Sequence, residues 1–292
     1  MKYILYKQRT FSDKFNLSFE WLRDNWKPVL KYVSLLLLPL SLLQGFGQNA
    51  VTGMYIQGGG SMDMGIPSGA LLSVGLYYLC TLLGGFLAYS LFFTFMKLSM
   101  VDGVDLNAQT FAQVWKAMRE NMGRLFLGGL VLLLLTVIAV ACAVAAAMAG
   151  PVGFVLFTLL GIFLAPVIFP FMPAYLLGSN GLVASFQQGL RLGYKCWWGF
   201  VSTTVVMGLL ASVLQGFGAV PFYICIFFKA LFIGSSGDGS VLLDFLSYLS
   251  GVLLTYVMYV TSVLGVLMLT IQYGHAADKV DGVSSEREIE DF

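Results

Sequence analysis

The sequence predicts an all-α polytopic membrane protein with six transmembrane helices, and three observations carry that prediction. Hydrophobic residues make up 58% of the 292 residues and charged residues only 11%, whereas a soluble domain is roughly 25% charged. The apolar residues form long runs that lack the alternation of a half-buried strand. Short polar stretches separate these runs. We therefore expect one membrane-embedded domain over residues 1–274 and an acidic cytoplasmic tail over 275–292.

Six segments are long enough to cross a bilayer, because a transmembrane helix needs about 20 mainly apolar residues. They cover residues 29–47, 70–95, 125–148, 152–177, 200–220 and 241–272. A further apolar stretch over 222–233 is short and contains Lys229. We expect this stretch to be an interfacial or re-entrant piece and not a seventh span.

The lysine and arginine residues predict the orientation, because positive residues are retained on the cytoplasmic side of a membrane. All but one of the 16 lysines and arginines fall on one side of the six spans, and the exception is Lys229. Both termini are therefore predicted to be cytoplasmic, in a bacterial inner membrane. The connections on the other side are 48–69, the tight turn at 149–151 and 234–240.

One short sequence occurs twice, as SLLQGFG at residues 41–47 and as SVLQGFG at 212–218. The same offset aligns Trp26 with Trp197 and Gln44 with Gln215. An interfacial tryptophan thus precedes the glutamine of a span by the same distance in both copies. This correspondence predicts an internal repeat.

Three segments before the first, third and fifth spans have apolar residues on one helical face and charged residues on the other. Each ends in a helix breaker or a small residue at the entry to a span, namely Pro28, Gly123 or Gly199. The chain therefore reads as three units, over about 12–100, 107–178 and 183–274, each an amphipathic helix followed by an out-and-back hairpin. Such units all enter the membrane from one side, unlike the inverted repeats of many secondary transporters.

Two of these segments carry a resemblance to a known family. SFEWLRDNWKP at 18–28 and SFQQGLRLGYKCWWG at 185–199 both begin with Ser-Phe and place basic residues before an apolar hairpin. In this pattern the chain resembles bacterial integral membrane proteins related to the membrane domain found with some glycerophosphodiester phosphodiesterases. The resemblance covers nearly the whole chain and implies a membrane fold. It implies no catalytic residues, because the soluble phosphodiesterase domain is not expected here.

The sequence offers no constellation for catalysis or metal binding. The only histidine, His275, lies just beyond the last span, and the motifs HExxH and GxSxG are missing. The four cysteines are scattered singly, without the spacing of a metal site or a disulfide framework. We therefore predict no enzyme activity, no metal and no cofactor. The net charge of +1 predicts no nucleic-acid partner.

Ionisable residues in the predicted spans lie near the ends. Lys31 and Lys97 are placed at cytoplasmic ends, where long side chains can reach the interface, and Asp244 at an exterior end. Charged residues inside lipid are costly and usually mark ion pathways. Their absence from the middle of the spans argues against proton or ion coupling.

Polar and proline residues inside the spans have both a packing and a functional interpretation. Gln44 and Gln215, beside close glycines, predict helix packing through amide hydrogen bonds, and the alternative is a small pore or ligand cleft. Pro166, Pro170 and Pro173 predict a bent or broken fourth span. A fixed kink is the simpler interpretation, and a hinge or binding site at the break is the alternative.

The basic faces of the amphipathic segments predict contacts with anionic lipid headgroups. The predicted contact residues are Lys116, Arg119, Arg124, Arg191, Lys195, Trp26 and Trp197. The same basic residues would also serve simply as signals of orientation.

These observations lead to one functional prediction and one alternative. We expect a non-enzymatic integral membrane protein that acts as a scaffold or subunit of a membrane assembly, with membrane lipids and other membrane proteins as partners. The alternative is a channel or uncoupled transporter for a lipid or a small neutral solute. An enzyme acting on membrane lipids would need a cytoplasmic cluster around His275 that the sequence does not reveal.

Overall fold

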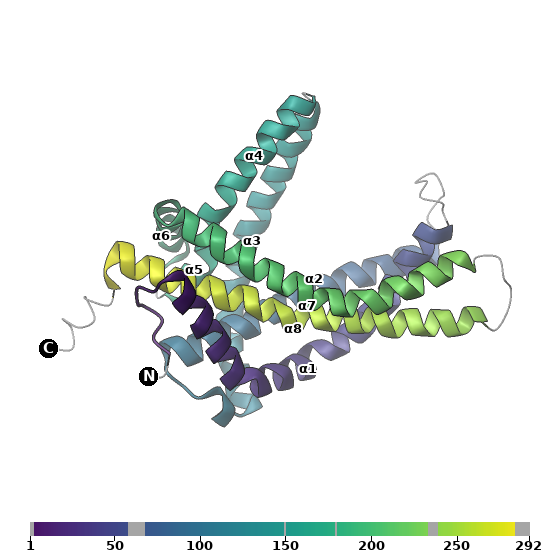
Figure 1. Cartoon of the computed structure of the whole chain (residues 1–292), viewed down its shortest axis with the longest axis horizontal. Helices are drawn as coiled ribbons and strands as arrows, with labels where there is room; N and C mark the ends of the chain where they lie inside the picture. Colours follow the sequence, from purple (N-terminus) through teal and green to yellow (C-terminus); the bar gives the residue numbers. More distant parts are fainter. Residues whose placement is uncertain (1–2, 58–67, 149, 179, 233–238, 284–292) are drawn as a thin grey trace. The chain divides into compact units, whose positions relative to one another are not determined.

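The computed structural model describes residues 3–57, 68–148, 150–178, 180–232 and 239–283, which are mostly helical and contain no β-strand (Figure 1). The helices in chain order are α1 (Phe11–Gln57), α2 (Ser68–Met96), α3 (Phe111–Met148), α4 (Pro151–Ile168), α5 (Phe171–Leu177), α6 (Leu182–Lys195), α7 (Trp197–Leu231) and α8 (Gly239–Asp281). A π-helical turn (Lys97–Val101) and a 3-10 turn (Leu106–Ala108) connect α2 to α3.

Six helical segments are long and apolar enough to cross a membrane, which confirms the predicted all-α, multi-pass class. They are Phe11–Gly53, Leu72–Val101, Phe111–Met148, Pro151–Leu177, Trp197–Leu231 and Val241–Asp281. The glycine-rich stretch 58–60, most of the connection at 234–240 and the end of the acidic tail lie outside the described residues.

The chain divides into two compact units, each assembled from segments that are distant in the sequence. Unit 1 comprises Met1–Asn25, Ser90–Met207 and Gly265–Phe292, and unit 2 comprises Trp26–Tyr89 and Gly208–Leu264. The long helices α1, α2, α7 and α8 each contribute residues to both units. These two units differ from the three hairpin units, consecutive along the chain, that the sequence predicted.

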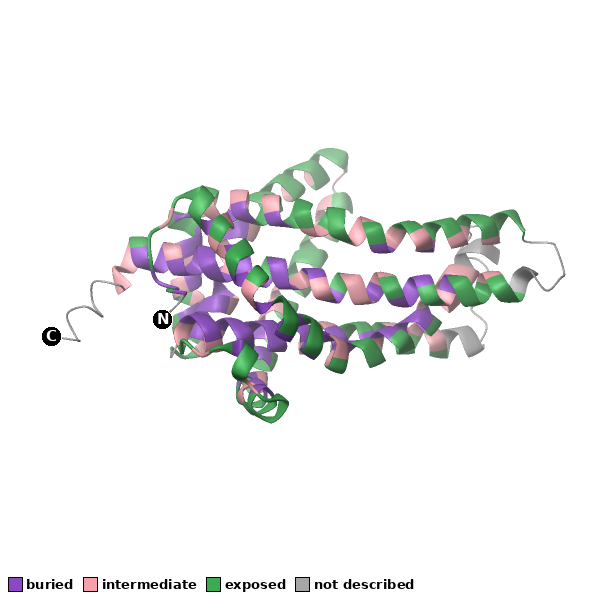
Figure 2. Ribbon diagram, turned by 60° about the horizontal axis from the view of Figure 1, so that its bottom comes forward, coloured by how far each residue is buried: buried purple, intermediate pink, exposed green. Residues whose placement is uncertain are grey.

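Each unit has its own buried core. In unit 1, Trp21, Phe95 and Phe200 are fully buried, and Trp21 Nε1 donates to Ser99 Oγ at 2.9 Å. Figure 2 shows the buried residues of this unit as purple ribbon close to the labelled N-terminus. In unit 2, Tyr32 and Leu37 of α1 are buried. The burial of a tryptophan and several phenylalanines in unit 1 removes large apolar areas from water.

The first amphipathic segment is not a separate helix, because α1 continues through Pro28. A proline lacks a backbone N–H and so leaves the carbonyl four residues earlier, here Asp24, without its helical donor. Asn107 Nδ2 donates to this carbonyl oxygen at 3.3 Å. A side chain from the segment after α2 thus replaces the missing donor, and the predicted break at Pro28 is wrong.

Two further predicted boundaries also fall inside continuous helices. Helix α3 runs through Gly123, so the second amphipathic segment is continuous with the third span. Helix α7 runs through Pro221 to Leu231, so the stretch 222–233 is not a separate interfacial piece. Only the third segment is a helix of its own, because α6 ends at Lys195 and α7 begins at Trp197.

The fourth span breaks where the prolines predicted it. Helix α4 ends at Ile168, Pro170 precedes α5, and Pro166 and Pro173 lie inside α4 and α5. All three prolines are buried. Helix α6 lies across this break, and a Cβ added at Gly189 would stand 2.8 Å from Phe171 Cα. The break is therefore covered by α6 within unit 1.

A methyl group added at Gly193 would overlap the backbone of Val167 in α4. We expect Gly193→Ala to lower the free energy of unfolding by about 1–3 kcal/mol, because neither backbone can yield cheaply. Gly161→Ala in α4 is the matched control, since a Cβ there meets nothing within 4 Å. Thermal unfolding in detergent measures both, and equal stability of the two variants would contradict the packing described here.

Candidate functional site

Gln44 of α1 is the buried polar centre of unit 2, with 2% of its surface exposed. Its Nε2 donates to Thr81 Oγ1 of α2 at 2.9 Å, and its Oε1 accepts from the Tyr259 hydroxyl of α8 at 3.0 Å. The amide therefore links three helices with both of its ends bonded. These contacts support the helix-packing interpretation of Gln44 over the lining of a pore.

Gln215 of α7 makes the same contact in the second copy of the heptad. Its Nε2 donates to Thr261 Oγ1 of α8 at 3.0 Å. Thr261 in turn donates to the Val257 carbonyl at 2.8 Å, as Thr81 donates to the Tyr77 carbonyl at 2.8 Å. Each glutamine thus reaches a threonine whose own hydrogen is already bonded one turn earlier in the next spanning helix.

The glycine three residues after each glutamine approaches the same position of the facing helix. A Cβ added at Gly218 would lie 3.1 Å from Val257 Cβ. A Cβ added at Gly47 would overlap the Cβ of Tyr77. Small residues let helix backbones approach closely in a membrane. The repeated heptad therefore produces one contact geometry twice, once between α1 and α2 and once between α7 and α8.

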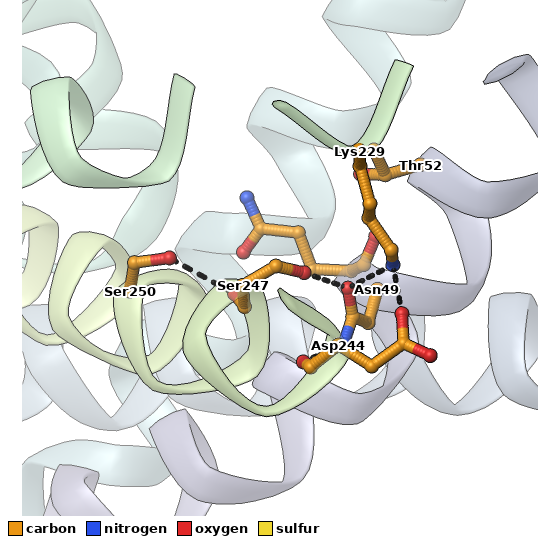
Figure 3. Close-up of polar contacts among 7 residues, drawn as sticks. Asn49, Thr52, Lys229, Asp244, Ser247 and Ser250 are labelled. Atoms are coloured by element: carbon orange, nitrogen blue, oxygen red, sulfur yellow. Dashed lines mark hydrogen bonds and ion pairs between the residues drawn. The ribbon is translucent and has the colours of Figure 1, made fainter. Parts of the chain in front are cut away.

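A polar cluster joins α1, α7 and α8 at another place in unit 2 (Figure 3). Lys229 Nζ lies 2.6 Å from Asp244 Oδ1 and donates to Asn49 Oδ1 at 3.2 Å. Asn49 also accepts from the Ser247 hydroxyl and donates to the Asp244 carbonyl. Lys229 is thus paired with a carboxylate, which explains how a lysine is accommodated in an apolar stretch.

Arg124, a predicted headgroup contact, instead closes the end of α5 within unit 1. Its guanidinium donates to the Gly178 carbonyl at 3.1 Å and to the Asn180 carbonyl at 2.8 Å. It also stands over the Tyr175 ring, 4.8 Å from the centroid. The last carbonyls of a helix have no intrahelical donor. Arg124 therefore stabilises the chain after the fourth span.

Arg191 and Trp197 also have partners inside unit 1. Arg191 forms an ion pair with Asp281 at 2.7 Å, which joins α6 to the end of α8. Trp197 Nε1 donates to the Phe163 carbonyl of α4 at 2.7 Å. By contrast, Lys116, Arg119, Lys195 and Trp26 are exposed and therefore accessible to lipid.

The structure also reveals a buried lysine that the sequence analysis did not single out. Lys14 of α1 is 5% exposed, and its Nζ donates to Gln272 Oε1 of α8 at 2.7 Å. Nearby, the backbone N–H of Arg9 donates to His275 Nδ1 at 3.0 Å. These bonds fasten the N-terminal segment to α8. The partners are more than 250 residues apart in the chain, so no local pattern could have paired them.

Cys196, between α6 and α7, is a buried thiol beside several lysines. Burial raises the pKa of this thiol above its ordinary value, although Lys279, Lys14 and Lys195 act in the opposite direction. The thiol is therefore protonated at neutral pH, and a protonated thiol is a weak nucleophile. The described residues include no group of three or more His, Cys, Asp or Glu side chains that could hold a metal ion.

The fold and these polar contacts define a polytopic α-helical membrane protein in which Gln44 and Gln215 each bond to a neighbouring helix. Of the residues proposed for a cleft, the glutamines belong to unit 2 and the three prolines to unit 1. In comparisons with protein families, curated proteins and solved structures, nothing matches this chain. The resemblance to the phosphodiesterase-associated membrane domain stays a prediction.

The two glutamines provide a matched pair of substitutions. We expect Gln44→Leu to lower the free energy of unfolding by about 1–3 kcal/mol, because the buried Tyr259 hydroxyl loses its acceptor. Gln215→Leu should cost less, about 0.6 kcal/mol, the mean for one interhelical bond in a membrane. Denaturant unfolding in mixed micelles tests this order, and an equal loss in both variants would contradict it.

Substitutions of Arg124 and Arg119 distinguish an arginine with a structural role from one that contacts lipid. Arg124→Gln should lower the free energy of unfolding by about 1–3 kcal/mol, because two carbonyls lose a charged donor. Arg119→Gln should leave stability within about 0.5 kcal/mol. It should instead weaken retention of anionic lipid, by about 1 kcal/mol for one basic residue. Denaturant unfolding measures the stability of each variant, and mass spectrometry of co-purified phosphatidylglycerol measures lipid retention. An Arg124→Gln variant as stable as the unmodified protein would refute the structural role of Arg124.

Proposed function

We propose that this protein is a non-enzymatic subunit or scaffold of a membrane assembly in the bacterial inner membrane. Its basic helical surfaces contact anionic lipid on the cytoplasmic side, where both termini lie. The observation that carries the proposal is the lack of burial along the α3–α4 hairpin. None of the described residues of 129–165, which form the second half of α3 and most of α4, is buried.

The exposure of this hairpin is clearest when the buried share is taken over the most apolar stretch of each span. In these stretches 0% of α3 and 6% of the fourth span are buried, against 11% for the fifth span and 39–56% for the first, second and sixth. Leu134 on α3 and Leu156 on α4 are each 61% exposed. The hairpin thus presents its helical surfaces outward along most of its length.

The composition of α3 supports a protein partner for these surfaces. Near the end of α3, residues 139–147 read AVACAVAAA and are dominated by small residues. Helix association in membranes depends on close backbone approach, because lipid tails compete equally for large apolar side chains. A surface of large apolar side chains packs equally well against lipid and against protein, whereas a surface of small residues lets another helix approach closely.

The proposal also includes the internal repeat. The α1–α2 and α7–α8 hairpins are taken as parallel copies, supported by the heptad and by the matching bonds of Gln44 and Gln215. The third unit keeps the hairpin form and lacks the heptad. In this arrangement two hairpins share the packing role in unit 2, which leaves the α3–α4 hairpin available to a partner.

Site-specific photocrosslinking in native membranes tests the partner. A photoreactive residue at Leu134 or at Leu156 should give a discrete adduct with a protein of constant mass. The same residue at Leu82 on α2, which is 73% exposed, serves as the control and should give lipid adducts. The captured protein should also co-purify with the unmodified chain after mild solubilisation. Lipid adducts alone at all three positions, with recovery as a lone monomer, would refute the proposal.

A further inference from the structure

Lys14 is a buried lysine of unit 1 that has no carboxylate partner. It is 5% exposed, and its Nζ donates to Gln272 Oε1 at 2.7 Å. Within the part of the chain that the structure describes, no aspartate or glutamate forms an ion pair with Lys14. Lys229, by contrast, pairs with Asp244 at 2.6 Å. A buried charge is costly unless it is paired, so the Lys14 ammonium group needs a counter-ion.

The surroundings of Lys14 carry an excess of positive charge. The charged side chains that act electrostatically on Lys14 are Lys279 and Arg9, and both are cations. Two carboxylates, those of Asp13 and Asp278, act on Arg9. Three cations and two carboxylates leave one positive charge in excess. This part of unit 1 is therefore suited to a negatively charged ligand.

Two other titratable groups near Lys14 are neutral. Cys196 is protonated at neutral pH, because burial raises the pKa of its thiol. His275 accepts the Arg9 backbone N–H through Nδ1 at 3.0 Å, and a ring nitrogen that accepts a hydrogen bond carries no proton. Neither group supplies the missing negative charge.

The amide of Gln272 provides a second observation that points to an acceptor at this place. Gln272 is fully buried, and its Nε2 has no hydrogen-bond partner among the described residues. Because an ammonium group can only donate, the bond from Lys14 fixes Oε1 as the acceptor and leaves Nε2 as the nitrogen. A buried donor without an acceptor is destabilising unless a ligand or water bonds to it. Lys14 and Gln272 thus offer adjacent N–H donors without an acceptor for them.

Close packing around Gln272 restricts the size of the occupant. A Cβ added at Gly199 of α7 would overlap Gln272 Nε2, and the neighbouring residues Phe200 and Ile271 are fully buried. A lipid phosphate or another large oxyanion therefore does not fit. A water molecule would accept from the amide, but it would leave Lys14 without a counter-ion. A halide is a single atom that accepts several N–H bonds and carries the required charge.

We propose that Lys14 Nζ and Gln272 Nε2 bind one small monovalent anion of the size of chloride, independently of the partner proposed for the hairpin. The anion would bond to the first turns of α1 and to the last part of α8, beside the direct bond between Lys14 and Gln272. It would balance the excess positive charge and accept from the amide at the same time. The attachment of the N-terminal segment to α8 would then depend on the concentration of the anion.

Thermal unfolding of the full chain in a neutral detergent tests the proposal. Sodium chloride is replaced by sodium gluconate at constant ionic strength, because gluconate is too large for the site. Gln272→Glu places a carboxylate beside Lys14 and so supplies an internal counter-ion. Lys14→Met removes the charge that the anion would balance. Lys116→Met is the matched control, since Lys116 is an exposed lysine of α3.

The unmodified protein and Lys116→Met should gain about 2–4 °C in unfolding midpoint for each tenfold rise in chloride above the dissociation constant. Lys14→Met and Gln272→Glu should show no chloride dependence, and in gluconate Gln272→Glu should unfold at a higher temperature than the unmodified protein. Anomalous diffraction from crystals grown in sodium bromide should place one bromide against Lys14 Nζ and Gln272 Nε2.

Three results would overturn the proposal. Equal midpoints of the unmodified protein in chloride and in gluconate would indicate a neutral Lys14 amine with water at the Gln272 amide. Chloride dependence that persists in Gln272→Glu would place the anion elsewhere, and so would bromide found only at other positions. Gln272→Glu keeps the proposal testable even where Lys14→Met does not fold.

Discussion

Unit 1 depends on side chains that bond to backbone carbonyls where a helix cannot supply its own donor. The last carbonyls of a helix, and the carbonyl four residues before a proline, have no helical donor and bond to side chains or water. Asn107 bonds to the Asp24 carbonyl that Pro28 leaves free, and Arg124 bonds to the carbonyls of Gly178 and Asn180 after α5. These contacts supply donors to carbonyls beside Pro28 and at the end of the fourth span.

The same requirement explains which parts of the fold could be predicted from the sequence. The spans follow from the length of the apolar runs, which the bilayer thickness imposes locally. The break at Pro170 follows from three prolines within a short stretch, too many for neighbouring groups to compensate. The continuity at Pro28 could not be predicted, because its compensation comes from Asn107, a residue that lies 83 positions from the carbonyl it bonds.

The charged residues show a similar limit. Composition and the positive-inside rule group every basic residue except Lys229 on one side, but they do not distinguish a lipid contact from a structural one. Arg124 and Arg191 have carbonyl or carboxylate partners inside unit 1, whereas Lys116 and Arg119 are exposed. Whether a basic residue finds a partner in the protein depends on where the chain runs after the fourth and sixth spans. For Gln44 the sequence indicated a packing role and left its partners, Thr81 and Tyr259, unspecified.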